Sequence, residues 1–327
     1  MSTIASKSEG LTRRLRRQIV RGRFQPGQRL PNRAEIGERY DVGVSTIQRA
    51  LDELRRDGFI HARGRAGTFV TERPPHLANI AIAYPNSRGN SSRLYNAIRD
   101  AAELRTTAEL RFTEYVVSLH VEYQQGRQRL LDDAAHHRFG GVFFAYPPSN
   151  LKNEPTLHQP DLPRVALAPE AKYGPSIAAD LDSFRHRALD HLEARGCRRI
   201  AHLSVESHFP MRDVITPVLR QRGVEIRPYW MQSVAQGVDF RSATNLVHLL
   251  MKLPEPDRPD GLILHDDNLV EPAVAGLVAA HASVPHDLAV VALTNFPSIA
   301  PSPAVTAMPS VYQTATKAGE SSVHVKA

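Results

Sequence analysis

The sequence predicts a small α+β domain at the N-terminus, followed by an α/β domain made of two doubly wound lobes. Two observations lead to this prediction. Three helical patterns and a short hairpin pattern fill residues 10–72, whereas strand and helix patterns alternate from residue 78 onward. The chain has 327 residues, which is enough for two or three folding units that each bury a core.

Positive charge is concentrated in the first quarter of the chain. Residues 1–76 contain sixteen basic and eight acidic residues, a balance of +8, whereas the remainder has 25 basic and 26 acidic residues, a balance of −1. Neutralising phosphates with such charges releases counterions and favours binding. We therefore expect double-stranded DNA as the partner of this quarter, rather than a basic tail that only keeps the protein soluble.

Composition excludes several other classes of protein. There is no apolar run of the ~18 residues that a membrane span needs, and the N-terminus lacks the apolar core of a secretory signal, so a cytoplasmic location is expected. A single cysteine, Cys197, leaves nothing for a disulfide or a zinc ribbon. Phosphate-binding glycine loops and the G-x-S-x-G motif are missing, and adjacent residues such as His136 and His137 do not converge on one ion. We therefore expect no enzyme, no cofactor and no metal.

Two helices precede the central one in the N-terminal domain. Residues 1–9 are expected to be disordered, and a helix is predicted from residue 10 to residue 22. Its apolar positions recur every four residues: Leu11, Leu15 and Ile19. A Pro-Gly turn follows, and a second helix is predicted over residues 33–40, with Ile36 and Tyr40 buried.

The third helix, expected from residue 44 to about residue 57, is the element around which the domain is organised. Ile47, Leu51 and Leu54 repeat at the spacing of one apolar face. The other face offers short hydroxyls, an amide and a guanidinium, which are the groups that read base edges and bind phosphates. These residues are Ser45, Thr46, Gln48, Arg49 and Asp52. Gly58 then fits the left-handed position that ends a helix.

A hairpin follows the third helix. Phe59–Arg63 and Thr68–Thr71 are two β-prone runs joined by a glycine-containing turn, with Arg63 and Arg65 at its tip. Three helices and a basic-tipped hairpin form the outline of a winged helix-turn-helix. In that arrangement the third helix enters the major groove, and the hairpin reaches the neighbouring backbone or minor groove.

The run LPNRAEIGERYDVGVSTIQRALDELRRDGFIHARGRAGTFV resembles the GntR-type winged-helix domain along its whole length. The matching pieces are PG-x-x-LP, A-L-x-x-L, D-G-F-I and G-T-F-V. The resemblance implies DNA contacts from the start of the second helix, the turn and the wing. These contacts fall on Asn32, Arg33, Ser45, Thr46, Gln48, Arg63, Arg65 and Gly67.

The chain departs from the family pattern at the entrance of the third helix. The family commonly has Ser-Arg or Thr-Arg where this sequence has Gly43 and Val44, and the arginine after the second-helix proline falls on Ala34, with Arg33 one place earlier. The missing arginine removes a contact to guanine worth ~1–3 kcal/mol of discrimination. The operator is therefore expected to differ from the family norm.

Beyond a short stiff linker at residues 73–77, strands and helices alternate, which predicts parallel sheets covered on both faces. Strands are expected at 80–84, 110–119, 141–146 and 164–167, with helices at 91–104 and 122–137. A second lobe begins near Ser176. Its strands are expected at 199–204, 261–265 and 288–293, and its helices at 184–195, 211–222 and 271–281.

Polar or aromatic residues just past strand ends are the candidates for a ligand site. They are Asn86, Arg88, Tyr146, Glu206, His208, Arg212, Asp266 and Asp267. For most of them an ordinary loop position is the preferred interpretation. A carbohydrate or small acid needs paired hydrogen bonds and an aromatic face from such residues.

The segments HLEARGCRRIAHLS, GLILHDDNLVEPAVAGL and VPHDLAVVALTNFPSIAPSPAVTAM resemble the ligand-binding domain of LacI-type repressors, over roughly residues 78–308. The resemblance implies a two-lobed fold of the periplasmic-binding-protein-like type I, with Arg212 on sugar hydroxyls and Asp266 facing the ligand. Where the family has an aspartate, this chain has Thr294 followed by Asn295, a further candidate. Residues 310–327 are short and polar, so the closing part is expected to be shortened, divergent or disordered.

These observations predict a DNA-binding transcriptional regulator, a repressor by resemblance. Its operator affinity is controlled by a small-molecule effector such as a sugar, bound between two α/β lobes. A homodimer on a palindromic operator is expected, because one short helix gives little specificity. One alternative is a DNA-binding protein whose second domain only dimerises. Another is an enzyme fused to a DNA-binding domain, but Lys152 and Lys172 lack the context of a pyridoxal-binding lysine.

Overall fold

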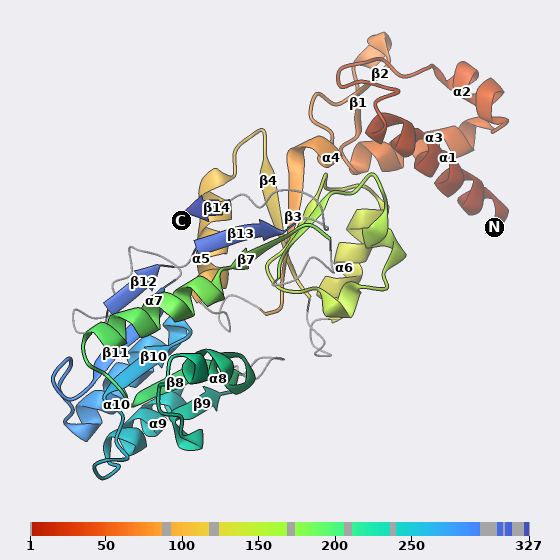
Figure 1. The fold of residues 1–327 in the computed structure, drawn as a ribbon. Coiled ribbons are helices and arrows are strands. Elements are labelled where there is room, and N and C mark those ends of the chain that lie inside the picture. Colours follow the sequence, from red (N-terminus) through yellow and green to blue (C-terminus); the bar gives the residue numbers. More distant parts are fainter. Residues whose placement is uncertain are drawn as a thin grey trace. The chain divides into compact units, whose positions relative to one another are not determined.

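A computed structural model of the chain describes residues 2–86, 93–117, 124–168, 174–205, 211–235, 240–294, 306–309, 311–315 and 324–326 (Figure 1). The chain divides into two compact units. The first comprises residues 1–87 and 98–176, and the second comprises residues 88–97 and 177–327.

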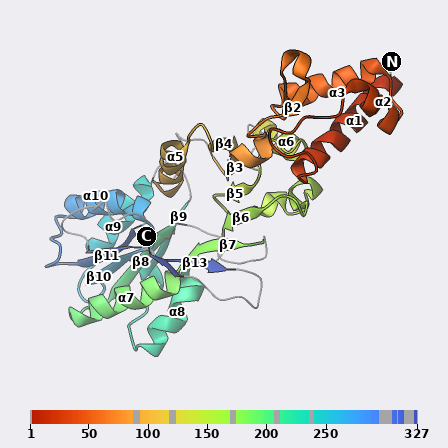
Figure 2. The same cartoon turned by 90° about the horizontal axis from the view of Figure 1, so that it is seen from above.

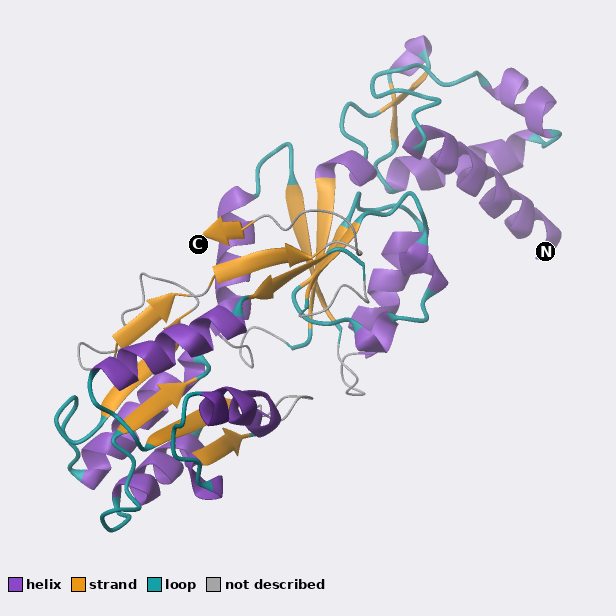
Figure 3. Cartoon of the chain, in the orientation of Figure 1, coloured by secondary structure: helices purple, strands orange, loops and turns teal. Residues whose placement is uncertain are grey.

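The N-terminal domain has three helices and a two-stranded hairpin, as predicted (Figure 3). Its elements are α1 (Ser2–Val20), α2 (Arg33–Tyr40), α3 (Val44–Arg56), β1 (Ile60–Ala62) and β2 (Thr68–Val70). The two strands pair antiparallel, with Ile60 opposite Val70. Gly58 has a φ of 79°, so it adopts the left-handed conformation expected after α3.

The first helix begins at Ser2, which corrects the expectation that residues 1–9 are disordered. A contact between distant parts of the chain lies within this N-terminal stretch of the helix. Thr12 donates to the Ser8 carbonyl one turn earlier and lies 3.1 Å from the Glu53 carboxylate on α3. Both Ser8 and Thr12 are buried, so packing extends the helix beyond its apolar repeat.

One apolar cluster fills the interior of the N-terminal domain. Its buried members are Leu11, Leu15, Ile19, Phe24, Leu30, Ile36, Ile47, Ala50, Leu51, Leu54, Phe59, Ile60 and Val70. The predicted apolar faces of the three helices all contribute to it. Tyr40 is only partly buried, because its hydroxyl donates to the Gln18 side chain at 3.1 Å.

The linker is less extended than predicted. Pro74 is extended, but Pro75 opens a short helix, α4 (Pro75–Ala78). Proline suits the first turn of a helix because its φ is already helical and the hydrogen-bond donor that it lacks is not needed there.

The first α/β lobe contains β3 (Asn79–Tyr84), α5 (Arg93–Arg105), β4 (Arg111–Val116), α6 (Gln124–Ala135), β5 (Val142–Phe144), β6 (Arg164–Leu167) and β7 (Ser176–Ala179). The strand order of its sheet is β14-β13-β7-β6-β5-β3-β4. β3 pairs parallel with both β4 and β5, and β5 pairs parallel with β6. The C-terminal strands β13 (Val311–Ala315) and β14 (His324–Lys326) belong to the same sheet.

The second lobe contains α7 (Leu181–Ala194), β8 (Ile200–Val205), α8 (Met211–Gln221), β9 (Met231–Val234), α9 (Arg241–Met251), β10 (Gly261–Leu264), α10 (Val270–Ala280), β11 (Ala289–Thr294) and β12 (Thr306–Pro309). Its strands are all parallel, in the order β12-β11-β10-β8-β9. β9 and α9 were not predicted from the sequence.

Helices cover both faces of this second sheet (Figures 1 and 2). Leu262 and Leu264 of β10 pack in a cluster with α9 and α10, whereas Ile263 between them packs in a cluster with α7 and α8. This alternation confirms the predicted doubly wound arrangement.

Two buried histidines lie side by side within the second lobe. His202 Nδ1 and His265 Nε2 are 3.1 Å apart, and both side chains are almost fully buried. Burial lowers the pKa of His202 from 6.5 to about 3 and holds the pKa of His265 well below its usual value, with the Arg185 charge acting in the same direction. The folded lobe therefore holds both rings neutral.

The lobe is expected to lose stability in mild acid. In the unfolded chain the His202 ring gains a proton below its usual pKa of 6.5, whereas in the folded chain it does so only near 3, so the free energy of unfolding falls across that window. The loss between about pH 7 and pH 5 is about 2 kcal/mol for His202 alone. Urea titrations followed by fluorescence of the buried Trp230 measure it. His202→Leu flattens the pH dependence, and the exposed-site control His286→Gln leaves it unchanged.

Candidate nucleic-acid interface

The two faces of α3 differ in exposure. Its buried residues are Thr46, Ile47, Ala50, Leu51 and Leu54. Its exposed residues are Val44, Ser45, Arg49, Arg55 and Arg56. The side chains of Gln48 and Asp52 are partly exposed. Thr46 is only 6% exposed, which corrects its assignment to the DNA-facing side. It lies one turn before Ala50, and residues four apart on a helix share a face.

Gln48 is oriented by its neighbours on the same face. Its amide nitrogen lies 2.9 Å from both carboxylate oxygens of Asp52, and Arg55 donates to the same carboxylate at 2.8 Å. The amide oxygen of Gln48 is the group turned away from Asp52. Gln48 is therefore arranged to accept a hydrogen bond, and Arg49 and Ser45 beside it are exposed.

The start of α2 is fixed by a reciprocal cap. Asn32 Oδ1 accepts from the Glu35 amide at 3.0 Å, and the Glu35 carboxylate accepts from the Asn32 amide at 2.8 Å. The cap occupies the Asn32 side chain, whereas Arg33 next to it is exposed. Among the two, Arg33 is the side chain available for a phosphate or base.

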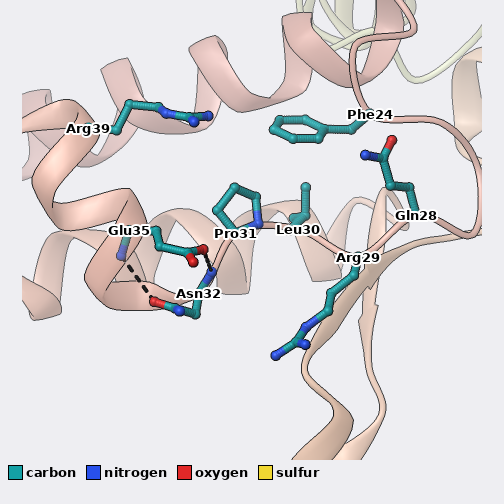
Figure 4. A pocket seen from close by; sticks show the side chains of 8 residues that line it. All are labelled: Phe24, Gln28, Arg29, Leu30, Pro31, Asn32, Glu35 and Arg39. Atoms are coloured by element: carbon teal, nitrogen blue, oxygen red, sulfur yellow. Dashed lines mark hydrogen bonds between the residues drawn. The ribbon is translucent and has the colours of Figure 1, made fainter.

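An open pocket of about 420 Å³ lies beside this cap (Figure 4). It is lined by Phe24, Gln28, Arg29, Leu30, Pro31, Asn32, Glu35 and Arg39. Arg29 and Arg39 add two exposed cations that the sequence analysis did not select. They could have been found from the basic character of the PG-x-x-LP segment and of the second helix.

The wing holds its two arginines differently. The Arg63 guanidinium lies 4.8 Å from the centre of the Phe69 ring, donates to His61 at 2.9 Å and is 3.6 Å from Glu72. These contacts anchor Arg63 against the hairpin. Arg65 lies in the short 3-10 turn Gly64–Ala66 and is exposed at the tip.

Gly67, which was predicted to contact DNA, closes the wing turn. Its φ of 114° is open only to glycine, and a β-carbon there would lie 2.8 Å from Arg29 Nε. Arg29 also forms a β-bridge with Phe69 of β2. The PG-x-x-LP segment and the wing are therefore packed together, and both carry exposed arginines.

A buried ion pair joins α1 to the C-terminal end of α3. The Arg16 guanidinium on α1 pairs with the carboxylate of Asp57, the residue that follows α3, and both side chains are 4% exposed. Arg16 also lies 3.5 Å from Glu53. Burial lowers the pKa of Arg16, and the Asp57 carboxylate opposes that shift.

The candidate effector residues belong to both units of the chain. Asn86 and Tyr146 lie in the first unit, and Arg212 and Asp266 lie in the second. Tyr146 is 9% exposed and packs in the core of the first lobe, where its hydroxyl donates to the Val117 carbonyl at 3.0 Å. Tyr146, predicted as an effector contact just past a strand end, therefore has little exposed surface. Arg212 is exposed in the first turn of α8. Arg88, Glu206, His208 and Asn295 lie outside the described residues.

Asp266 caps the 3-10 turn Asp267–Leu269 by accepting from the Asn268 amide at 2.9 Å. Burial raises the pKa of Asp266, against the hydrogen bonds from Asn268, which lower it. Tyr95 lies close by, and burial together with the Asp266 charge raises the pKa of Tyr95 to about 12. Arg93 donates its backbone amide to Asn268 and pairs with Glu271 at 2.7 Å. Tyr95 and Arg93 were missed, although both lie in the helix that was predicted to follow the first strand.

Cys197 is buried, and burial raises the pKa of its thiol above the usual value. A raised pKa leaves little thiolate, which agrees with a structural role for this residue. Among the described residues, no cluster of histidine, cysteine and acidic side chains could hold a metal ion, and no helix combines the length and apolarity of a membrane span.

Two protein-family models match separate parts of the chain. Residues 7–70 match the family of bacterial regulatory proteins of the gntR type, and residues 189–323 match the periplasmic binding protein-like domain. The arabinose metabolism transcriptional repressor of Geobacillus stearothermophilus is 21% identical over 293 residues, 85% of this chain and 79% of the relative. The putative HTH-type transcriptional regulator RmpR of Mycobacterium gastri is 37% identical over 70 residues, 21% of this chain and 26% of the relative.

Among solved structures, the fold resembles a LacI family transcriptional regulator from Lactobacillus casei with bound sucrose, at a TM-score of 0.52 and 18% identity. The likeness covers 70% of this chain and 84% of that one. The chain is therefore a DNA-binding transcriptional regulator whose second part has an effector-binding fold. More particularly, it joins a GntR-type winged helix-turn-helix domain to a periplasmic-binding-protein-like domain.

Proposed function

We propose that this chain is a repressor that binds its operator through α3, the start of α2 and the wing, and that a sugar or related metabolite bound by the α/β domain changes operator affinity. The observation that carries the proposal is the divided surface of α3. One face is sealed in the domain core, and the other exposes Ser45 and Arg49 beside the acceptor of Gln48. A helix with this division, next to a basic wing, is suited to the major groove.

The proposed DNA contacts are Arg33, Ser45, Gln48, Arg49 and Arg65 as exposed or acceptor side chains. Asn32, Arg63 and Gly67 act mainly by shaping the surface. Asn32 caps α2, Arg63 packs on Phe69, and Gly67 allows Arg29 to approach the wing turn.

The variant Arg33→Ala, Gln48→Ala is expected to bind operator DNA at least tenfold more weakly. Each lost base contact is worth ~1–3 kcal/mol, and a lost phosphate contact also reduces the salt dependence of binding. Fluorescence anisotropy with duplexes selected from a random pool measures both quantities at several salt concentrations.

A matched control is the variant Arg220→Ala, Gln221→Ala, which removes an exposed arginine and glutamine from α8. This control is expected to keep full affinity. Unchanged affinity of the Arg33→Ala, Gln48→Ala variant would contradict the proposed contact surface.

The sugar class of effector is supported by two comparisons. The relative from Geobacillus stearothermophilus is named for arabinose metabolism, and the Lactobacillus casei structure holds sucrose. Within this chain, Arg212 and Asp266 are the proposed polar contacts, with Tyr95, whose pKa is raised in part by the Asp266 charge, as the aromatic group. Calorimetric titration of the full chain with pentoses, hexoses, disaccharides and sugar phosphates tests the proposal. The absence of binding across that panel would favour a second domain that only dimerises.

We further propose a homodimer on a palindromic operator. A single recognition helix contacts few base pairs, and two-fold symmetry doubles the contacts without new chemistry. Light scattering of the chain with and without a selected duplex is expected to give a mass of two chains per duplex. A single chain on an asymmetric site would contradict this part of the proposal.

A further inference from the structure

The first residue of the recognition helix is an apolar side chain with no protein partner to bury it. Val44 opens α3 and is 68% exposed. All other large apolar side chains of residues 7–70 are buried or partly buried. Valine also forms helices less readily than most residues, so its presence at an exposed helical position is not explained by helix stability.

The backbone before Val44 leaves its surroundings open. The N-cap is Gly43, which provides no side-chain hydrogen bond to the helix, and a β-carbon placed on Gly43 would meet nothing within 4 Å. The space beside Gly43 is therefore open. Ser45 beside Val44 is exposed as well, and Gln48 lies one turn further along the same face.

This entrance is the part of the helix that reaches base edges in the mode of binding proposed above. The major groove offers one prominent apolar group, the 5-methyl group of thymine, and the other groups on its floor donate or accept hydrogen bonds. Valine can neither donate nor accept a hydrogen bond. Its contact with a guanine or an adenine edge would remove water from that edge and leave its polar groups without a hydrogen-bond partner.

We propose that Val44 determines part of the operator sequence by packing against the 5-methyl group of a thymine in each half-site. The inference rests on the proposed function, because it requires α3 to enter the major groove. The acceptor of Gln48 complements it, since an amino group of adenine or cytosine one or two base pairs away is the donor that this acceptor fits. Each half-site is thus recognised through a contact of Val44 with a thymine methyl group and a hydrogen bond to Gln48 from an amino group of adenine or cytosine.

The test uses the full-length chain and duplexes selected from a random pool. Each thymine of the selected half-site is replaced in turn by deoxyuridine, which lacks only the 5-methyl group. One position is expected to lose about fourfold in affinity, which corresponds to ~0.8 kcal/mol for one buried methyl group. Val44→Ala is expected to lose a similar factor on the thymine duplex and to become insensitive to deoxyuridine at that position.

Val278→Ala is the matched control, because Val278 on α10 is 69% exposed and lies in the other unit. It is expected to keep both the affinity and the sensitivity to deoxyuridine. Val44→Arg, selected against the same pool, is expected to replace the thymine by guanine.

Two results would overturn the assignment of Val44. One is full affinity for duplexes with deoxyuridine at every thymine position. The other is a deoxyuridine effect of the same size in Val44→Ala and in the parent chain. If the parent chain selects no sequence from the pool, the proposed function itself is contradicted, so the two failures are distinguishable.

Discussion

Replacing Asp57 by alanine is expected to destabilise the N-terminal domain by about 3 kcal/mol, because it leaves a buried guanidinium without its main partner. Arg16 and Asp57 are both 4% exposed, so neither charge can be rehydrated without opening the domain. Glu53, 3.5 Å from Arg16, retains part of the compensation. The pair also connects α1 to the residue that follows α3, so its loss is expected to loosen the helix that we propose to read DNA.

Hydrogen exchange followed by mass spectrometry measures this loss locally, because exchange in α1 and α3 reports opening of the N-terminal domain. The control is Asp52→Ala. Asp52 pairs with Arg55, and both side chains are 42% exposed, so its loss is expected to cost less than ~1 kcal/mol. Equal protection in Asp57→Ala and the parent chain would show that the buried pair contributes nothing to stability.

Asp57 also forms an ion pair with Arg138, in the segment after α6. Arg138 donates to Asp57 at 2.8 Å and to Asp133 at 2.7 Å, and Asp133 accepts from the Tyr115 hydroxyl. These residues lie in the same compact unit. The carboxylate at the end of α3 is therefore shared between Arg16 of α1 and Arg138 of the first lobe.

The domain order and most elements could be predicted from the sequence because they follow from local rules. The four-residue repeat of Leu11, Leu15 and Ile19 identified α1, and Gly58 marked the end of α3. Charge counting located the DNA-binding quarter. The same rules failed where the extent of an element depends on packing between residues that are distant in the sequence. The N-terminal part of α1 contacts Glu53 of α3 through Thr12, and no repeat reveals that contact.

The residues of the candidate site were predicted from the chemical type of their side chains, and their positions on the helix faces were not used. Thr46 carries the right hydroxyl, yet its spacing from Ala50 places it on the buried face, so stricter use of helical periodicity would have excluded it. Asn32 belongs to a capping pattern, N-x-x-E, that was readable in the sequence. The approach of Arg29 to Gly67 was not readable, because it depends on how a turn and a hairpin 38 residues apart in numbering come together.

Gly67→Ala is expected to destabilise the wing by about 2–3 kcal/mol, the cost of a backbone conformation that is essentially restricted to glycine. The φ and ψ of Gly67 are 114° and −162°. The added methyl group would also lie 2.8 Å from Arg29 Nε, so Arg29 must move away from the wing turn. Because Arg29 and the wing tip form part of the basic surface, operator affinity is expected to fall along with stability.

Gly64→Ala is the control within the same turn. Gly64 has a φ of 54°, a left-handed value that other residues adopt at moderate cost, and its surroundings are open. Its expected cost is about 1 kcal/mol. Arg29→Ala in the Gly67→Ala background separates the two causes, because removing the guanidinium relieves the clash and leaves the backbone strain. If the double variant is as unstable as Gly67→Ala, strain alone accounts for the glycine, and Arg29 takes no part in positioning the wing.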